Sequence, residues 1–221
     1  MEFLSTTGVK SQLIDILAYL PVSGHTLECR KGQIIYDWNN PSTNLYLVTT
    51  GKVKLTRLRA GRSPVLLEIV RPDELFGESA LLNVSGGFEQ AVALEKAQLV
   101  TWSASTMEDL VLTEPRLGVA ILQLLAQRCI ESTRRIESLS LDSVQQRLAN
   151  SLIYFSDRLG TREEDGTIRM IPFTHQMLAQ YIGTSREIVT VYMNQFRKQG
   201  YLRYSRKGIT LYRDTFHKSL Y

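Results

Sequence analysis

Short apolar runs separated by turn residues fill the chain from Thr26 to about Trp102. The runs lie at 33–36, 45–48, 53–56, 65–70, 91–94 and 99–102, and turn residues break the chain at 39–42, 50–51, 60–64, 71–73 and 85–87. Short strands at regular spacing with turn signals between them are typical of an all-β sandwich or roll. We therefore expect an antiparallel β-roll in this part of the chain.

The pattern becomes helical after the last of these runs. Ser105 and Glu108 form a Ser-x-x-Glu pattern, which predicts a helix that starts near Thr106 and is interrupted around Pro115. From 115 to 139 apolar residues recur mostly three or four positions apart, which predicts one amphipathic helix of about 37 Å. Because such a helix needs a partner, we expect a second copy of the chain, with coverage of the β-roll as the alternative. The expected dimer seam consists of Leu117, Ile121, Leu124, Leu125 and Arg128.

Another helical region is expected after a joint at 139–142. Asp142 is predicted to cap the N-terminus of this helix, whose apolar positions begin at Val144. The polar stretch 160–166 predicts a surface loop or a hairpin tip.

Residues 174–199 have the pattern of two helices joined by a tight turn. Gly183 is expected to end the first helix, and Thr184 with Glu187 fits a capping box for the second. One face of the second helix carries apolar anchors, whereas the opposite face carries side chains that hydrogen-bond to bases. This arrangement is typical of a helix-turn-helix that enters the major groove of DNA. The anchors are Val189, Met193 and Phe196, and the polar face carries Arg186, Glu187, Thr190 and Asn194.

The chemistry of the first two polar residues suits base readout. Arg186 can donate two hydrogen bonds to guanine, and Glu187 can accept one from cytosine. The alternatives are that Arg186 contacts only phosphate and that Glu187 only caps the helix. A hairpin with strands at 201–204 and 209–212 follows, and its tip carries Arg206 and Lys207. Such a wing would contact phosphates, with a solubilising surface turn as the alternative.

Charge supports a polyanionic partner for the C-terminal part. The 221-residue chain has a net charge of +4, but residues 170–221 hold eight Lys or Arg against two acidic residues, a net charge of +6. Residues 1–169 therefore carry a net charge of −2. A basic end on a slightly acidic body is expected of a nucleic-acid-binding protein.

Other function classes receive little support from the residues. Cys29 and Cys129 lack the spacing of a disulfide framework or a metal site, and both thiols are expected to be buried. No paired nucleophile and base, phosphate loop or metal-ligand cluster occurs, so we expect neither an enzyme nor a cofactor. No apolar run approaches the roughly 20 residues of a membrane span, and the N-terminus has no signal-peptide pattern, which predicts a cytoplasmic protein.

The order of these segments resembles the cyclic-AMP receptor protein and fumarate-nitrate regulator (CRP/FNR) family over essentially the whole chain. The segments that carry the resemblance are 45–55, 75–82 and, most specifically, 182–189. The resemblance implies an α+β fold: an antiparallel β-roll of the cyclic-nucleotide-binding, cupin-like type at 1–114, a dimerisation helix at 115–141 and a winged helix-turn-helix at 142–221. The DNA-binding residues it implies are Thr174, Thr184, Ser185, Arg186, Glu187, Thr190, Val191, Asn194, Arg206 and Lys207.

The family also implies function and partners. We expect a homodimer that binds a two-fold symmetric operator in double-stranded DNA and recruits or blocks RNA polymerase. The alternative is a ligand-sensing module that regulates a partner protein rather than DNA. Val191 stands where the family often has a second Arg of the recognition helix, so the half-site is expected to differ from that of the cyclic-AMP receptor.

The effector pocket departs further from the family pattern. Gly77 and Glu78 match the ribose side of the pocket, but Glu89 and Gln90 stand where cyclic-AMP binders have the Arg-Ser pair for the phosphate. A phosphate that faces Glu89 would be repelled, so we expect no control by cyclic AMP. We include Ser132 in this candidate pocket. The iron–sulfur branch of the family needs several N-terminal cysteines that the chain lacks, and His25 is the one weak candidate for a haem ligand.

Overall fold

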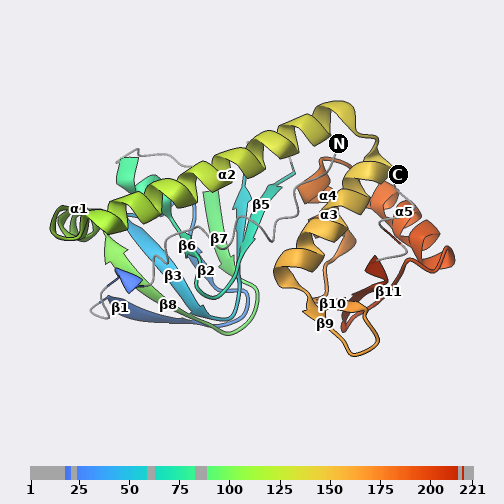
Figure 1. Cartoon of the computed structure of the whole chain (residues 1–221), viewed down its shortest axis with the longest axis horizontal. Coiled ribbons are helices and arrows are strands. Elements are labelled where there is room, and N and C mark those ends of the chain that lie inside the picture. The colour runs from blue at the N-terminus through green and yellow to red at the C-terminus, as the bar shows by residue number, and fades with distance from the viewer. Residues whose placement is uncertain (1–17, 21–23, 59–62, 83–88, 214–215, 217–221) are drawn as a thin grey trace. The chain divides into compact units, whose positions relative to one another are not determined.

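The computed structural model describes residues 18–20, 24–58, 63–82, 89–213 and 216 (Figure 1). The chain divides into two compact units. One consists of Met1–Leu55 with Ile69–Arg135, and the other of Thr56–Glu68 with Ile136–Tyr221. The long helix therefore contributes residues to both units.

Two four-stranded sheets form the β-roll, as the pattern of short strands predicted. Strand order is β1-β8-β3-β6 in the first sheet and β2-β7-β4-β5 in the second. The first sheet contains β1 (His25–Cys29), β8 (Ala97–Ser103), β3 (Asn44–Thr50) and β6 (Leu75–Phe76). The second contains β2 (Ile34–Tyr36), β7 (Glu89–Ala93), β4 (Val53–Arg57) and β5 (Val65–Val70). Strands β1 and β6 were not predicted, because β1 mixes polar and apolar residues and β6 has only 2 residues. The predicted turn at 85–87 lies outside the described residues.

The two faces of strand β3 have different neighbours. Side chains alternate along a strand, so Leu45 and Leu47 lie on one face and Tyr46 on the other. The leucine face packs against helices α1 (Ala104–Thr113) and α2 (Pro115–Leu141), and together they form one hydrophobic cluster. Its members include Leu45, Leu47, Leu75, Trp102, Met107, Leu117 and Ile121.

The dimer seam predicted from the sequence is wrong at two positions for this reason. Leu117 is 0% exposed and Ile121 is 8% exposed, because both pack on the β-roll of their own chain. Leu124 packs against the same cluster. The alternative reading, in which the helix covers the β-roll, is therefore correct for this stripe. Leu125 lies on a more exposed side of the helix, at 36%.

The helix boundaries follow the predictions to within a few residues, but the caps differ. Helix α1 spans Ala104–Thr113 with Ser103 as its N-cap, two residues before Ser105. Helix α2 spans Pro115–Leu141, and α3 spans Val144–Leu159. Ser143, not Asp142, caps α3, because the Ser143 side chain and Gln146 form a reciprocal capping box. Asp142 instead accepts a hydrogen bond from the hydroxyl of Ser138 at 2.6 Å.

The C-terminal unit contains α3, two shorter helices and a sheet of order β11-β12-β10-β9. The helices are α4 (His175–Ile182) and α5 (Arg186–Lys198). The polar stretch at 160–166 belongs to a hairpin, as predicted, which pairs β9 (Thr161–Arg162) with β10 (Ile168–Met170). Strands β11 (Leu202–Ser205) and β12 (Gly208–Leu211) form the predicted wing hairpin.

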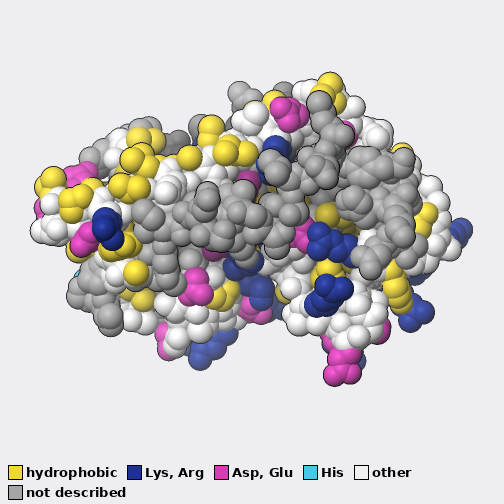
Figure 2. All heavy atoms as spheres, viewed as in Figure 1, with side chains coloured by type: hydrophobic (Ala, Val, Ile, Leu, Met, Phe, Trp, Pro, Cys, Tyr) yellow, Lys and Arg dark blue, Asp and Glu magenta, His cyan; other side chains and the backbone are white. Residues whose placement is uncertain are grey.

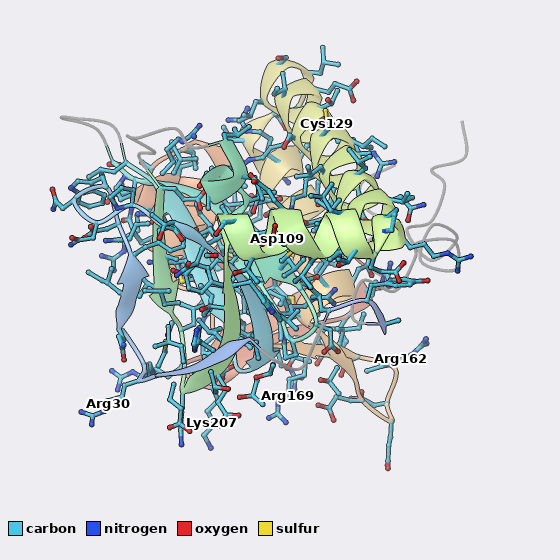
Figure 3. All side chains as sticks on the ribbon, turned by 90° about the vertical axis from the view of Figure 1, so that its left-hand side faces the viewer. Arg30, Asp109, Cys129, Arg162, Arg169 and Lys207 are labelled. Carbon is cyan, nitrogen blue, oxygen red and sulfur yellow. The ribbon has the colours of Figure 1, made fainter. Side chains whose placement is uncertain are left out.

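The two cysteines differ in exposure. Cys29 is buried as expected, but Cys129 is exposed, which corrects the prediction that both thiols are buried. Cys129 lies on α2, where Figure 3 labels it. Within the described part of the chain, no helix combines the length and the apolar character that crossing a membrane requires.

Candidate DNA-binding interface and the interior of the β-roll

Backbone hydrogen bonds fix the turn between α4 and α5. Gly183 adopts a left-handed conformation with a φ of 70°, which ends α4 as the sequence predicted. The backbone N–H groups of Gly183 and Thr184 both donate to the carbonyl of Ala179, at 3.0 and 3.1 Å. Ser185 caps α5, since its Oγ accepts from the N–H of Ile188 at 3.3 Å. The predicted Thr184–Glu187 capping box is therefore wrong by one residue.

Helix α5 buries one face and exposes the other. Val189 and Met193 are 0% exposed and Phe196 is 2% exposed, so the predicted anchors lie in the core. The side chains of Arg186, Glu187 and Val191 are exposed on the rest of the helix. Burial of three large apolar residues holds the exposed ones in a fixed register relative to the rest of the unit.

Arg186 and Glu187 open this helix with opposite charges. Among the described residues, no ion pair involves Arg186, so its guanidinium is available to a ligand. The carboxylate of Glu187 accepts hydrogen bonds from its own backbone N–H and from Ser185, and Arg186 adds a favourable charge, so its pKa is lowered. Glu187 is thus ionised at neutral pH and contributes to the start of α5, which agrees with the capping alternative. A base contact by either residue stays a prediction.

Two residues predicted to contact DNA already have partners within the protein. The hydroxyl of Thr190 donates to the carbonyl of Arg186 at 2.9 Å and lies 2.8 Å from Nδ1 of His175. Oδ1 of Asn194 accepts a hydrogen bond from the hydroxyl of Tyr204 at 3.0 Å. His175 and Tyr204 were not predicted as site residues, because their partners are 15 and 10 residues away on other elements.

The remaining predicted contacts lie at the first cap and on the wing. Thr174 caps α4, because its Oγ1 accepts from the N–H of Met177 at 3.1 Å. In the wing, Ser205 pairs with Gly208, which leaves Arg206 and Lys207 as the two residues of the turn. Both side chains are exposed, and Lys207 projects from the surface in Figure 3.

Several exposed basic side chains lie on α5 and on the wing hairpin. In the described part of the chain, no ion pair is found for Arg186, Arg197, Lys198, Arg203, Arg206 or Lys207. By contrast, Arg213 pairs with Asp157 at 2.6 Å. Unpaired basic groups raise the affinity for a polyanion, because binding releases condensed counterions.

Aromatic rings fill the space between the two sheets of the β-roll. Tyr46 and Phe76 are directly opposite each other on β3 and β6, with ring centroids 4.9 Å apart. Tyr36, from β2 in the second sheet, stacks on both rings at 5.7 and 6.1 Å. Gly77 is required beside them: its φ is 85°, and a Cβ there would lie 2.9 Å from the Tyr46 ring. The three rings occupy the interior next to Gly77.

The predicted effector residues form contacts of their own. The hydroxyl of Tyr36 donates to Glu89 at 2.5 Å, and burial together with this carboxylate raises the pKa of Tyr36 far above its ordinary value. The guanidinium of Arg128 is bonded to the Glu78 carboxylate and to the carbonyl of Leu75. Arg128 therefore contacts its own β-roll, and its place in the dimer seam stays a prediction.

Gln90 and Ser132 complete the predicted pocket residues. Gln90 follows Glu89 on β7 and is half-buried. Ser132 is exposed on α2. Gly77 and Glu89 thus lie at the aromatic cluster, Glu78 is bonded to Arg128, and Ser132 is exposed on α2.

Two family models match the chain, one in its N-terminal part and one in its C-terminal part. The cyclic nucleotide-binding domain matches residues 26–114, and the Crp-like helix-turn-helix domain matches residues 146–213.

Relatives are similar over most of their length. The transcriptional regulator SdrP of Thermus thermophilus is 32% identical over 163 residues, which cover 74% of this chain and 76% of that protein. A CRP-like cAMP-activated global transcriptional regulator of Mycobacterium tuberculosis is 25% identical over 182 residues, which cover 82% and 81%. A solved CRP/FNR-family regulator from Thermus thermophilus has a TM-score of 0.72 at 28% identity, covering 89% of this chain and 97% of that chain.

Proposed function

The chain belongs to the CRP/FNR family of DNA-binding transcription regulators, and from that premise we propose that it acts as a homodimer on a two-fold symmetric DNA site without control by cyclic AMP. The proposal that α5 reads DNA rests on one observation: one face of this helix is buried and the other is exposed. Its buried anchors fix the helix, and its exposed N-terminal part presents Arg186 and Val191. Arg186 would donate to a guanine, and Val191, which is 63% exposed, would contact a thymine methyl group.

A heptad pattern on α2 supports the homodimer. Leu122, Leu125, Cys129, Ser132 and Ile136 follow one another at spacings of three and four residues, and all five are exposed. Alternating steps of three and four give the a and d positions of a two-stranded coiled coil. We call these five residues the α2 seam. Figure 2 shows hydrophobic side chains gathered along α2.

The exposure of the α2 seam favours an interface in which a second copy of the chain covers it. Leu122 is 67% exposed and Ile136 is 64% exposed, so the protomer itself leaves these large apolar side chains in water. A symmetric pair of α2 helices would bury them against their own copies, as an isologous interface requires. Ser132 belongs to this interface in the proposal rather than to an effector pocket.

The contacts inside the β-roll support independence from cyclic AMP. One relative is described as cAMP-activated, but this chain has Glu89 and Gln90 where cyclic-AMP binders have Arg and Ser. The guanidinium of Arg128 is neutralised by Glu78, and the Glu89 carboxylate bonds to Tyr36. A cyclic phosphate would therefore face carboxylates without a free bidentate donor.

The expected partners follow from the exposed face of α5 and from the α2 seam. We expect double-stranded DNA, a second copy of the chain and RNA polymerase as partners, with regulation by recruiting or blocking the polymerase. The operator would have two half-sites about one helical turn apart, because the two α5 helices of a symmetric dimer enter successive major grooves.

One experiment tests the proposal. The purified full-length protein without added ligand selects duplexes from a random library, and the selected duplex is then titrated with and without cyclic AMP. We expect an inverted repeat with conserved guanines and the same affinity in both titrations. Recovery of no consensus would contradict the DNA-reading role and favour a module that acts on a partner protein. Calorimetric binding of cyclic AMP in the low micromolar range, coupled to tighter DNA binding, would contradict the effector part.

A further inference from the structure

Thr190 and Asn194 of α5 are each held by a side chain from a different element. His175 comes from the first turn of α4, and Tyr204 comes from strand β11 of the wing. Their rings contact each other edge to face, with centroids 5.2 Å apart at an angle of 65°. We call His175, Thr190, Asn194 and Tyr204 the recognition clamp. Three elements of the winged helix-turn-helix thus meet beside the exposed face of α5.

The first bond of the recognition clamp has a defined direction. A hydroxyl has one hydrogen, and that of Thr190 is donated to the carbonyl of Arg186. The bond between Thr190 and His175 must then have Nδ1–H of His175 as its donor. Thr190 thus connects His175 to the backbone carbonyl of Arg186, the residue proposed to contact a guanine.

The second bond fixes how the amide of Asn194 is turned. An unrestrained Asn reads adenine with both ends of its amide, because the oxygen accepts from N6 and the NH2 group donates to N7. Here the oxygen already accepts from the Tyr204 hydroxyl at 3.0 Å. The ring of Tyr204 is held in turn by His175 and by the guanidinium of Arg197, whose Cζ lies 5.4 Å from the ring centroid. This bond fixes the position of the amide oxygen, and among the described residues no hydrogen-bond partner is found for the NH2 group of Asn194.

We propose that His175 and Tyr204 are specificity-determining positioning residues, which orient Asn194 so that it presents its NH2 group as a hydrogen-bond donor to the base beneath it. This inference rests on the proposed function of α5 as the DNA reader. Asn194 then selects an acceptor edge, such as N7 or O6 of guanine or O4 of thymine, over a bidentate adenine contact. Neither positioning residue needs to touch DNA to act in this way.

The test is base preference rather than affinity alone. Tyr204→Phe removes the hydroxyl but keeps the ring that contacts His175 and Arg197. Full-length wild type and Tyr204→Phe are each titrated with the selected operator, with all single-base variants of one half-site and with scrambled duplex. We expect Tyr204→Phe to change the preference at one base pair by at least about fivefold, towards adenine, because the freed amide can rotate. Binding of scrambled duplex should stay within about twofold.

Two further variants separate positioning from loss of structure. Tyr212→Phe is the matched control, since it removes a tyrosine hydroxyl from the same unit outside the recognition clamp and should leave every preference unchanged. His175→Ala should broaden the preference, and His175→Asn, which keeps a donor near Nδ1, should restore it. Melting temperatures of all variants check that the unit is folded.

The outcomes distinguish the inference from the proposed function. If the wild type selects a consensus and folded Tyr204→Phe shows the same preference at every base pair, the recognition clamp does not determine specificity, although α5 still reads DNA. If His175→Asn behaves like His175→Ala, the bond to Thr190 is not the cause. If the wild type selects no consensus, the proposed function itself fails.

Discussion

Arg128 on α2 is bonded to the carboxylate of Glu78 within the β-roll unit, and the same guanidinium donates to the backbone carbonyl of Leu75. The long helix is therefore attached to the roll by charge as well as by Leu117 and Ile121. Because Arg128 and Glu78 neutralise each other, neither is free to hold a charged effector.

This pair predicts a measurable coupling between the two side chains. Their exposed fractions are 18% for Arg128 and 36% for Glu78, so solvent screens part of the attraction. We expect a coupling free energy of about 1 kcal/mol in a double-mutant cycle of Arg128→Met and Glu78→Gln, measured by urea unfolding. Strictly additive effects of the two substitutions would show that the pair contributes nothing to stability.

The α2 seam predicts a monomeric variant. Leu122→Lys combined with Ile136→Lys places charges between the two helices, where burying them is unfavourable. Sedimentation velocity should therefore detect monomers that bind the operator weakly. Leu112→Lys is the matched control, because Leu112 is 80% exposed on α1 and lies outside the α2 seam. A double variant that sediments like wild type would contradict the proposed interface.

The residues that face the β-roll predict the opposite behaviour. Leu117 is 0% exposed in the core of its own chain, so Leu117→Ala leaves a cavity there. We expect the free energy of unfolding to fall by about 2–5 kcal/mol. The folded variant should still sediment as the wild type does, because Leu117 is not part of the α2 seam. Loss of dimers without a decrease in the free energy of unfolding would show that Leu117 belongs to the dimer interface.

The sequence predicted the β-roll and the winged helix-turn-helix because their periodicities are strong and their turns carry Gly and Pro. It did not show which side of α2 packs on the β-roll, because α2 has two apolar stripes. Leu117, Ile121 and Leu124 form one stripe, and Leu122, Leu125 and Cys129 form the other. Spacings of three and four residues occur in both, and only the packed structure distinguishes the stripe that faces the roll.

Caps and polar partners were the least predictable parts of the site. Asp142 and Ser143 are both suitable N-caps, and the reciprocal bond to Gln146 selects Ser143. The partners of Thr190 and Asn194 come from α4 and β11, so no local pattern identifies them. Arg186, Glu187 and the wing residues could be placed from sequence, because they follow from helix periodicity and turn chemistry.

The stability of the C-terminal unit should depend on the protonation of His175. Burial, and then the charge of Arg186, lower the pKa of His175 below its ordinary value of 6.5. Below about pH 6.5 His175 is protonated more readily in the unfolded chain than in the folded unit. The free energy of unfolding therefore decreases as pH falls from 6.5 towards the pKa of His175 in the folded unit. The contribution of neutral His175 to the free energy of unfolding is fully present above pH 6.5.

His175→Asn isolates this effect, because it keeps a donor for Thr190 but does not titrate in this range. Urea unfolding at pH 7.5 and pH 5.5 should show a smaller loss of stability in the variant than in wild type. The contribution of carboxylates and other histidines is common to both proteins and cancels in the comparison. Equal losses would mean that His175 is not perturbed by the folded structure.

We claim that α5 reads DNA sequence through Arg186, and a comparison of Arg186→Ala with Lys207→Ala tests this role. Both variants are titrated with the selected operator and with scrambled duplex at several salt concentrations. Arg186→Ala should weaken the operator by about 1–3 kcal/mol more than scrambled duplex and remove the preference at one guanine. Lys207→Ala should weaken both duplexes equally and reduce the salt slope by about one unit for each phosphate that the variant no longer neutralises. Equal weakening of both duplexes by Arg186→Ala would contradict the claim.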